Sequence, residues 1–151
     1  MSSLYKQLLL LIIVAITGCA SAPTQEMSDA RQAVQAAQDA GADRHAPDTM
    51  KNAKQRLGKA GEEIQSGDFR GARRDAEAAK KNAIDAQDMS LAISGARIAV
   101  EKAAAKGVLT GASEVLLEKA EQAARVAEVS TAIRFAIDAK HQAEQDLRLE
   151  E

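Results

Sequence analysis

The only cysteine of the chain, Cys19, follows an apolar run and has the most definite chemistry that the sequence offers. The run from Leu8 to Ile16 is apolar throughout, and the small residues Thr17 and Gly18 separate it from the thiol. A thiol can form a disulfide, bind a metal or carry a covalent modification. Because the chain has no second cysteine, an exported protein would carry Cys19 as a free thiol, an intermolecular disulfide or a modified residue.

The segment before this cysteine has the organisation of an export signal. One basic residue, Lys6, precedes the apolar run, and small residues follow it. A helix of nine or ten residues rises only about 15 Å, whereas a bilayer core requires about 20 apolar residues. This pattern is typical of a signal peptide that is later removed. We therefore predict that the segment 1–18 is a signal peptide.

The motif Ile16-Thr17-Gly18-Cys19 resembles the lipobox of bacterial lipoprotein signal peptides. The resemblance implies that the Cys19 sulfur receives a diacylglyceryl group, that the chain is cut between Gly18 and Cys19, and that the new amine is acylated. Several acyl chains anchor stably where one chain is marginal. The next residue is Ala20 and not aspartate, which in a Gram-negative host implies the outer membrane, facing the periplasm. The alternative is an ordinary secretory signal cut near residue 20 or 22, which would discard the cysteine.

Composition argues against several classes of function. The formal net charge is −2, and this balance gives no electrostatic reason to expect nucleic acid. The chain has no tryptophan, and its only tyrosine, Tyr5, lies in the predicted signal, so platforms for stacking bases or sugars are almost absent. Alanine is abundant; it is the best helix former and buries little area. We therefore expect thin helices packed through small side chains, without a deep pocket.

Apolar residues recur at alternating steps of three and four, which predicts helices with one packed face. The expected helices span residues 28–40, 47–66, 68–106, 111–127 and 130–147; the third is one long central helix or two nearly collinear ones, and the last two could be fused. Gly41, Gly67 and Gly107 are placed as helix stops, Asp68 as an N-cap and Pro47 as a first helical residue. A second apolar line on the long helix repeats at every seventh position, at Ile84, Leu91 and Ile98. The predicted fold is all-α, built from antiparallel, alanine-rich helical hairpins.

Part of the chain recurs within itself. The pattern Ser28-x-Ala30-Arg31-x-Ala33-Val34 returns from Ser94 onward. The pattern Ala72-x-Arg74-x-Ala76 returns from Ala132 onward, at a shorter separation and without the Gly-Asp turn. If the match is not a chance similarity of alanine-rich helices, it predicts stacked helical hairpins. The resulting division is a signal at 1–18, a lipidated cysteine and tether at 19–27, a helical domain at 28–107 and a shortened second repeat at 108–151.

Several motifs together are similar to one family. They are the lipobox, Ala30-Arg31-x-Ala33-Val34, Ala40-Gly41-Ala42, Ala46-Pro47, Leu57-x-x-Ala60 and Gly67-Asp68-Phe69-x-x-Ala72-x-x-x-Ala76. Over residues 19–90 they resemble the domain-of-unknown-function family 4398, found in Gram-negative envelope lipoproteins. The resemblance implies an all-helical periplasmic lipoprotein and supplies no catalytic residues. The Gly-Asp-Phe turn also resembles that of tetratricopeptide repeats, whose larger aromatic signature is missing.

The remaining reactive side chains do not form a recognisable site. His45 and His141 are far apart and have no cysteine or second histidine nearby, so we expect no metal or other cofactor. The pairs Glu62-Glu63 and Asp85/Asp88 are expected to be solvated, because little apolar mass is available to shift their pKa values. We therefore predict no catalytic residues and a protein that is not an enzyme.

The leading hypothesis is a lipid-anchored helical module that binds another envelope component, protein or peptidoglycan-associated. The run Val115-Leu116-Leu117 is either part of its contact surface or core, and core is preferred. The basic residues Arg70, Arg73, Arg74, Lys80 and Lys81 could meet an anionic partner; local pairing with Asp75 and Glu77 is preferred. The alternative function is a self-associating structural spacer, in which the apolar lines form an intermolecular coiled coil.

Overall fold

The computed structural model describes residues 21–150, which form helices and no strands. The helices are α2 (Thr24–Asp39), α3 (Ala42–His45), α4 (Pro47–Ser66), α5 (Phe69–Ala105), α6 (Gly111–Arg125) and α7 (Val129–Leu149). The all-α prediction is therefore confirmed. The segment 1–18 and Cys19, where the signal and the lipidation site are predicted, lie outside the described residues.

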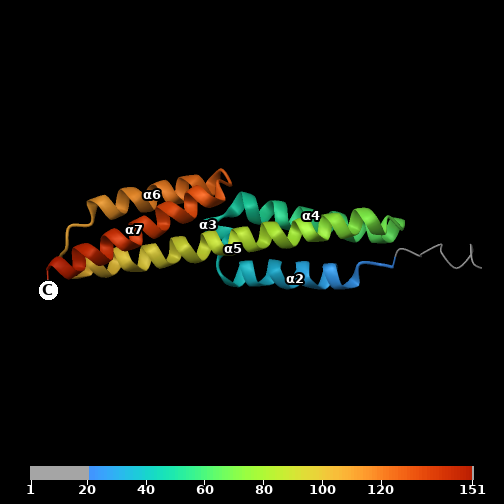
Figure 1. The fold of residues 1–151 in the computed structure, drawn as a ribbon, viewed down its shortest axis with the longest axis horizontal. Coiled ribbons are helices and arrows are strands. Elements are labelled where there is room, and N and C mark those ends of the chain that lie inside the picture. Colours follow the sequence, from blue (N-terminus) through green and yellow to red (C-terminus); the bar gives the residue numbers. More distant parts are fainter. Residues whose placement is uncertain (1–20, 151) are drawn as a thin grey trace, which may run out of the picture.

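The helices build a rod around α5 (Figure 1). At 37 residues, α5 is one continuous helix about 55 Å long. Its first half packs against α2 and α4, and its second half packs mainly against α7, with α6 covering α7. α4 and α5 form one antiparallel hairpin and α6 and α7 another, whereas α2 and α7 run in the same direction as α5 (Figure 1).

Local signals set most helix ends as predicted. Pro47 occupies the first turn of α4, and Gly41, Gly67 and Gly107 adopt positive φ angles of 79°, 82° and 82°. The Asp68 carboxylate accepts a hydrogen bond from the Gly71 N–H at 2.9 Å and caps α5.

Two N-terminal predictions were wrong. The expected tether extends to residue 27, but α2 begins at Thr24 because Met27 is buried against the core. The sequence analysis places no helix between residues 40 and 47, but this segment contains a single helical turn, α3, whose Ala42 is buried. Both elements depend on contacts with distant helices, which a local pattern does not reveal. The last two expected helices are separate, not fused.

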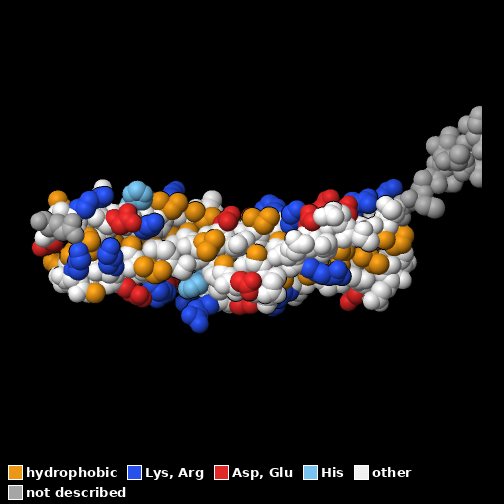
Figure 2. All heavy atoms as spheres, turned by 90° about the horizontal axis from the view of Figure 1, so that it is seen from below, with side chains coloured by type: hydrophobic (Ala, Val, Ile, Leu, Met, Phe, Trp, Pro, Cys, Tyr) orange, Lys and Arg blue, Asp and Glu red, His pale blue; other side chains and the backbone are white. Residues whose placement is uncertain are grey.

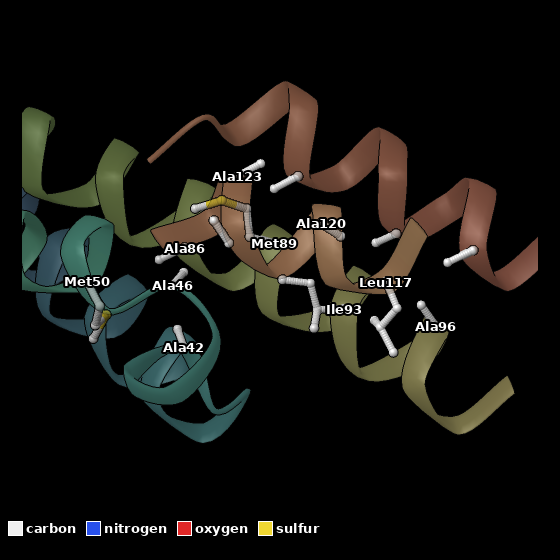
Figure 3. Packing of buried hydrophobic residues seen from close by; sticks show 14 of the residues in the cluster. Ala42, Ala46, Met50, Ala86, Met89, Ile93, Ala96, Leu117, Ala120 and Ala123 are labelled. Carbon is white, nitrogen blue, oxygen red and sulfur yellow. The ribbon is translucent and has the colours of Figure 1, made fainter. Parts of the chain in front are cut away.

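Alanines fill most of the core. Among the fully buried side chains, the bulkiest belong to Met50, Met89 and Ile93. Figure 3 shows these three side chains among alanines of several helices, with Leu117 beside Ala96. One buried cluster includes residues from Val34 in α2 to Ala143 in α7, so the two hairpins share a core through α5. A smaller cluster lies towards the N-terminal end of the rod.

The same turn conformation closes both hairpins. In the first, the N–H of Asp68 donates to the Glu63 carbonyl at 2.8 Å. In the second, the N–H of Glu128 donates to the Ala123 carbonyl at 2.9 Å, and Ala127 has a positive φ of 59° where the first turn has Gly67. The second copy thus lacks the glycine and aspartate, as the sequence indicates, but keeps the turn.

The second copy is shorter between its first helix stop and its hairpin. From Gly41, the chain forms α3 and the first turn of α4 before it reaches residue 51. After Gly107, only positions 108–110 precede α6. This helix starts at Gly111, the residue that corresponds to residue 51 of α4. The first unit consists of α2, α3, α4 and the first half of α5, and the second unit of the second half of α5 with α6 and α7. α3 has no counterpart in the second unit. The second half of α5 takes the place that α2 has in the first unit, so the two units share this helix.

Replacing Ala127 with glycine should stabilise the protein by about 0.5–1 kcal/mol, because a Cβ at positive φ is strained and glycine is not. Thermal and urea unfolding would measure the change. The reverse substitution, Gly67→Ala, should destabilise by a similar amount through its φ alone, since a Cβ there would meet no atom within 4 Å. Unchanged stability in both variants would contradict the strain argument.

Candidate interaction surface

The sequence analysis considered two histidines and two carboxylate pairs as candidates for a catalytic or metal site. Among residues 21–150, no three or more His, Cys, Asp or Glu side chains are close enough to hold a metal ion. Glu63 pairs with Lys59 at 3.3 Å and Asp85 with Lys81 at 2.5 Å, each one helical turn away. Asp85 stays partly exposed in its ion pair, at 23%. Glu63 is only 14% exposed, and within residues 21–150 its Oε2 is buried without a hydrogen-bond partner, so the expectation that Glu63 is solvated was wrong.

Two basic residues of α5 form ion pairs with acidic residues of α2, in addition to the pairs that form within α5. Arg73 donates to Glu26 at 2.6 Å, and Lys80 to Asp29 at 2.8 Å. A backbone hydrogen bond and the Arg73 side chain lower the pKa of Glu26; hydrogen bonds from Lys80 and Gln25 lower that of Asp29. These cations help to hold α2 on α5. The sequence analysis missed this role because the partners lie on different helices, far apart in the chain.

One carboxylate, Asp75, is fully buried beneath two cations of α4. Its side chain has no exposed surface; it accepts hydrogen bonds from Lys59 Nζ at 2.6 Å and from Arg56. Burial acts to raise the pKa of Asp75, but these hydrogen bonds outweigh it, and the pKa lies below its ordinary value. The sequence analysis missed this cluster and treated Asp75 only as a local surface partner.

The second unit replaces this ion pair with a ring. Where the first unit has Lys59, Arg74 and Asp75, the corresponding positions of the second are Lys119, Arg134 and Phe135. Both cations lie over the Phe135 ring, 5.8 and 5.1 Å from its centroid. The same place in the hairpin thus accepts a salt bridge or a cation–π contact, which indicates that the Asp75 cluster is structural.

A line of exposed apolar side chains runs along α5. Ile84, Leu91 and Ile98 are 41%, 53% and 66% exposed, and we call these three residues the α5 stripe. The face in Figure 2 shows charged side chains of both signs distributed along the rod, with hydrophobic ones between them. Aliphatic side chains that are exposed singly are ordinary, but these three recur at the seven-residue spacing at which helices pack side by side.

The α5 stripe continues into a groove between α5 and α7. The groove has a volume of about 520 Å³ and is lined by Ile98, Ala99, Leu147 and basic side chains that include Lys102 and Arg148. The triplet that the sequence analysis considered, at 115–117, is divided: Leu117 is buried in the core, whereas Val115 on α6 is 51% exposed. Val115 is therefore an exposed apolar residue that lies outside the α5 stripe, on a different helix.

Comparison with known proteins gives one match. A family described as "Domain of unknown function (DUF4398)" matches residues 25–108, which span α2 to α5 and end just after Gly107. No curated protein and no solved structure matched the chain. Within residues 21–150, no helix combines the length and apolarity needed to cross a bilayer.

Proposed function

The chain belongs to the DUF4398 family, and from that premise we propose that it is a non-enzymatic outer-membrane lipoprotein whose periplasmic helical body binds another envelope component. In this proposal Cys19 carries the lipid, and the α5 stripe is the contact surface. The stripe is the observation that carries the proposal, because three large aliphatic side chains remain exposed in one line along a single helix of a protein whose core is built mostly of alanines.

The folded body begins only a few residues after Cys19, which would place its N-terminal end close to the membrane. The Arg73 guanidinium donates to the Ser21 carbonyl at 3.5 Å, and α2 begins shortly afterwards, at Thr24. Cys19 precedes Ser21 by two positions, which span about 7 Å when extended. A lipid on Cys19 would therefore hold the N-terminal end of the rod at the membrane surface, with α5 leading away from that end (Figure 1).

The spacing of the stripe favours a helical partner. Side chains at every seventh position stay on one line of a helix and match the heptad period at which two helices pack side by side. We infer that the partner presents a helix with apolar residues at the same spacing. A second copy of this chain could offer such a helix, and the experiment below distinguishes the two cases.

Leu91→Glu should reduce partner capture at least about tenfold, because burying an unpaired carboxylate in an apolar seam costs more than about 1.4 kcal/mol. The measurement is cross-linking in cells through a photoreactive side chain at position 84, followed by purification of the full chain. Since Leu91 is half exposed, the variant should unfold as the wild type does.

Val115→Glu is the matched control, because Val115 is exposed to the same degree as Leu91 but lies on α6. It should leave capture unchanged. A product of twice the chain mass would identify self-association, and a product of another mass a different partner. Recovery of the monomer alone across growth conditions, or equal loss in both variants, would count against the proposal.

A further inference from the structure

A polar hollow lies where the first unit meets the second. It has a volume of about 300 Å³ and is lined by Arg44 and His45 of α3, Arg97 of α5, and Glu121 and Arg125 of α6. The hollow therefore draws on three helices that lie far apart in the sequence. It is distinct from the α5 stripe and shares no residue with it.

The charges in this hollow do not balance. Arg97 forms an ion pair with Glu121. Within residues 21–150, Arg44 and Arg125 form no ion pair, so the lining holds three guanidinium groups and one carboxylate; Arg125 also borders an adjoining hollow, together with Glu118. Guanidinium groups bind phosphate and carboxylate in a planar, two-bond geometry.

The hollow depends on α3, an element that only the first unit has. α3, which supplies Arg44 and His45, has no counterpart in the second unit. The arginine that corresponds to Arg97 in the first unit is Arg31, and it lies on the exposed surface of α2. The second hairpin, α6 and α7, therefore forms without an equivalent of α3. In the first unit, α3 contributes two of the five residues that line the hollow.

We propose that this hollow binds a small oxyanion, a ligand with a phosphate or carboxylate group that the three arginines share. Its volume lies at the lower end of the range for small-molecule sites, which favours a compact ligand over a drug-sized one. The inference does not depend on the lipid anchor or on the α5 stripe. A failure of this test would therefore leave the proposed function untouched.

His45 provides a spectroscopic reporter inside the hollow. Burial lowers the pKa of His45, the Arg97 and Arg44 charges lower it further, and Glu121 opposes them. An anion bound between the arginines would offset their repulsion of the imidazolium, so the pKa of His45 should rise on binding. The second histidine, His141, lies on α7 outside the hollow and serves as an internal control.

The experiment is a proton NMR titration of both imidazoles in the full chain, kept in a non-ionic detergent. Inorganic phosphate, succinate and chloride are compared at equal ionic strength. We expect phosphate or succinate to raise the His45 pKa by about half a unit or more relative to chloride, with His141 unchanged. A response to phosphate alone identifies a phosphate ligand, a response to succinate alone a carboxylate, and a response to both an oxyanion site of broad selectivity.

Arg44→Gln and Arg125→Gln should each weaken the binding of the effective anion about tenfold, the range expected for losing one charge-assisted contact. Both side chains are exposed, so the fold should persist, and circular dichroism checks this. Arg31→Gln is the matched control outside the hollow. No rise in the His45 pKa with either anion, or the same weakening in Arg31→Gln, would overturn the proposal.

Discussion

Asp75→Asn should lower the free energy of unfolding by about 1–3 kcal/mol, one of the largest effects expected for a single polar side chain here. The substitution keeps the volume of the side chain but removes the charge that Lys59 and Arg56 share. It also turns one acceptor into an amide donor that faces two cations. Both cations are about half exposed and can regain water, so the loss should stay below that of a fully buried pair. Urea unfolding at neutral pH measures it.

The pH dependence gives this prediction a second readout. Because the pKa of Asp75 is lower in the folded protein than its ordinary value of 3.8, the stabilisation is complete above that value and is lost as pH falls through the folded pKa. The stability difference between wild type and variant should thus be constant down to about pH 4 and shrink below it. Asp88→Asn, at an exposed position of the same helix, is the control. Equal costs for the two variants would contradict the role given to Asp75.

The helix ends were predictable where one residue determines the backbone. Gly67 and Gly107 end helices with positive φ, and Pro47 starts one, because these residue types restrict or permit backbone angles regardless of the surroundings. The long helix α5 was predictable for a related reason: its run of alanines favours helix at every step, and Gly95 alone does not interrupt it.

What could not be predicted depends on contacts between distant residues. Ala127 adopts a conformation usually left to glycine because the hairpin requires that turn, and nothing local signals it. The burial of Asp75 depends on α4 lying across it, and the hollow at His45 exists only because α6 returns to meet α3. In each case the local sequence indicates an ordinary surface residue, and only the packing of distant helices determines its conformation or its contacts.

If Cys19 carries the proposed lipid, Cys19→Ser should yield a form that keeps the segment 1–18 and carries no lipid. In the lipoproteins whose motif this segment resembles, the sulfur receives the diacylglyceryl group before the signal is cut, and a serine hydroxyl does not replace a thiol in that step. Each buried CH₂ of an acyl chain contributes about 0.8 kcal/mol to membrane binding. Because the variant keeps the apolar run 8–16, which can itself bind a membrane, the loss of the lipid is measured by mass and not by membrane partition. Mass spectrometry of the purified chain would read both lipidation and cleavage.

The result distinguishes lipidation from ordinary secretion. A secretory signal cut near residue 20 or 22 would discard the cysteine, so Cys19→Ser would then leave the mature protein unchanged. Ala20→Asp is the matched control at the neighbouring position. It should leave lipidation and cleavage intact and move the protein from the outer to the inner membrane in a Gram-negative host, as membrane fractionation would show. A wild-type chain that starts beyond residue 19, or that carries an unmodified thiol, would remove the anchor from the proposed function. The α5 stripe would then act in a freely diffusing protein, because its exposure does not depend on the lipid.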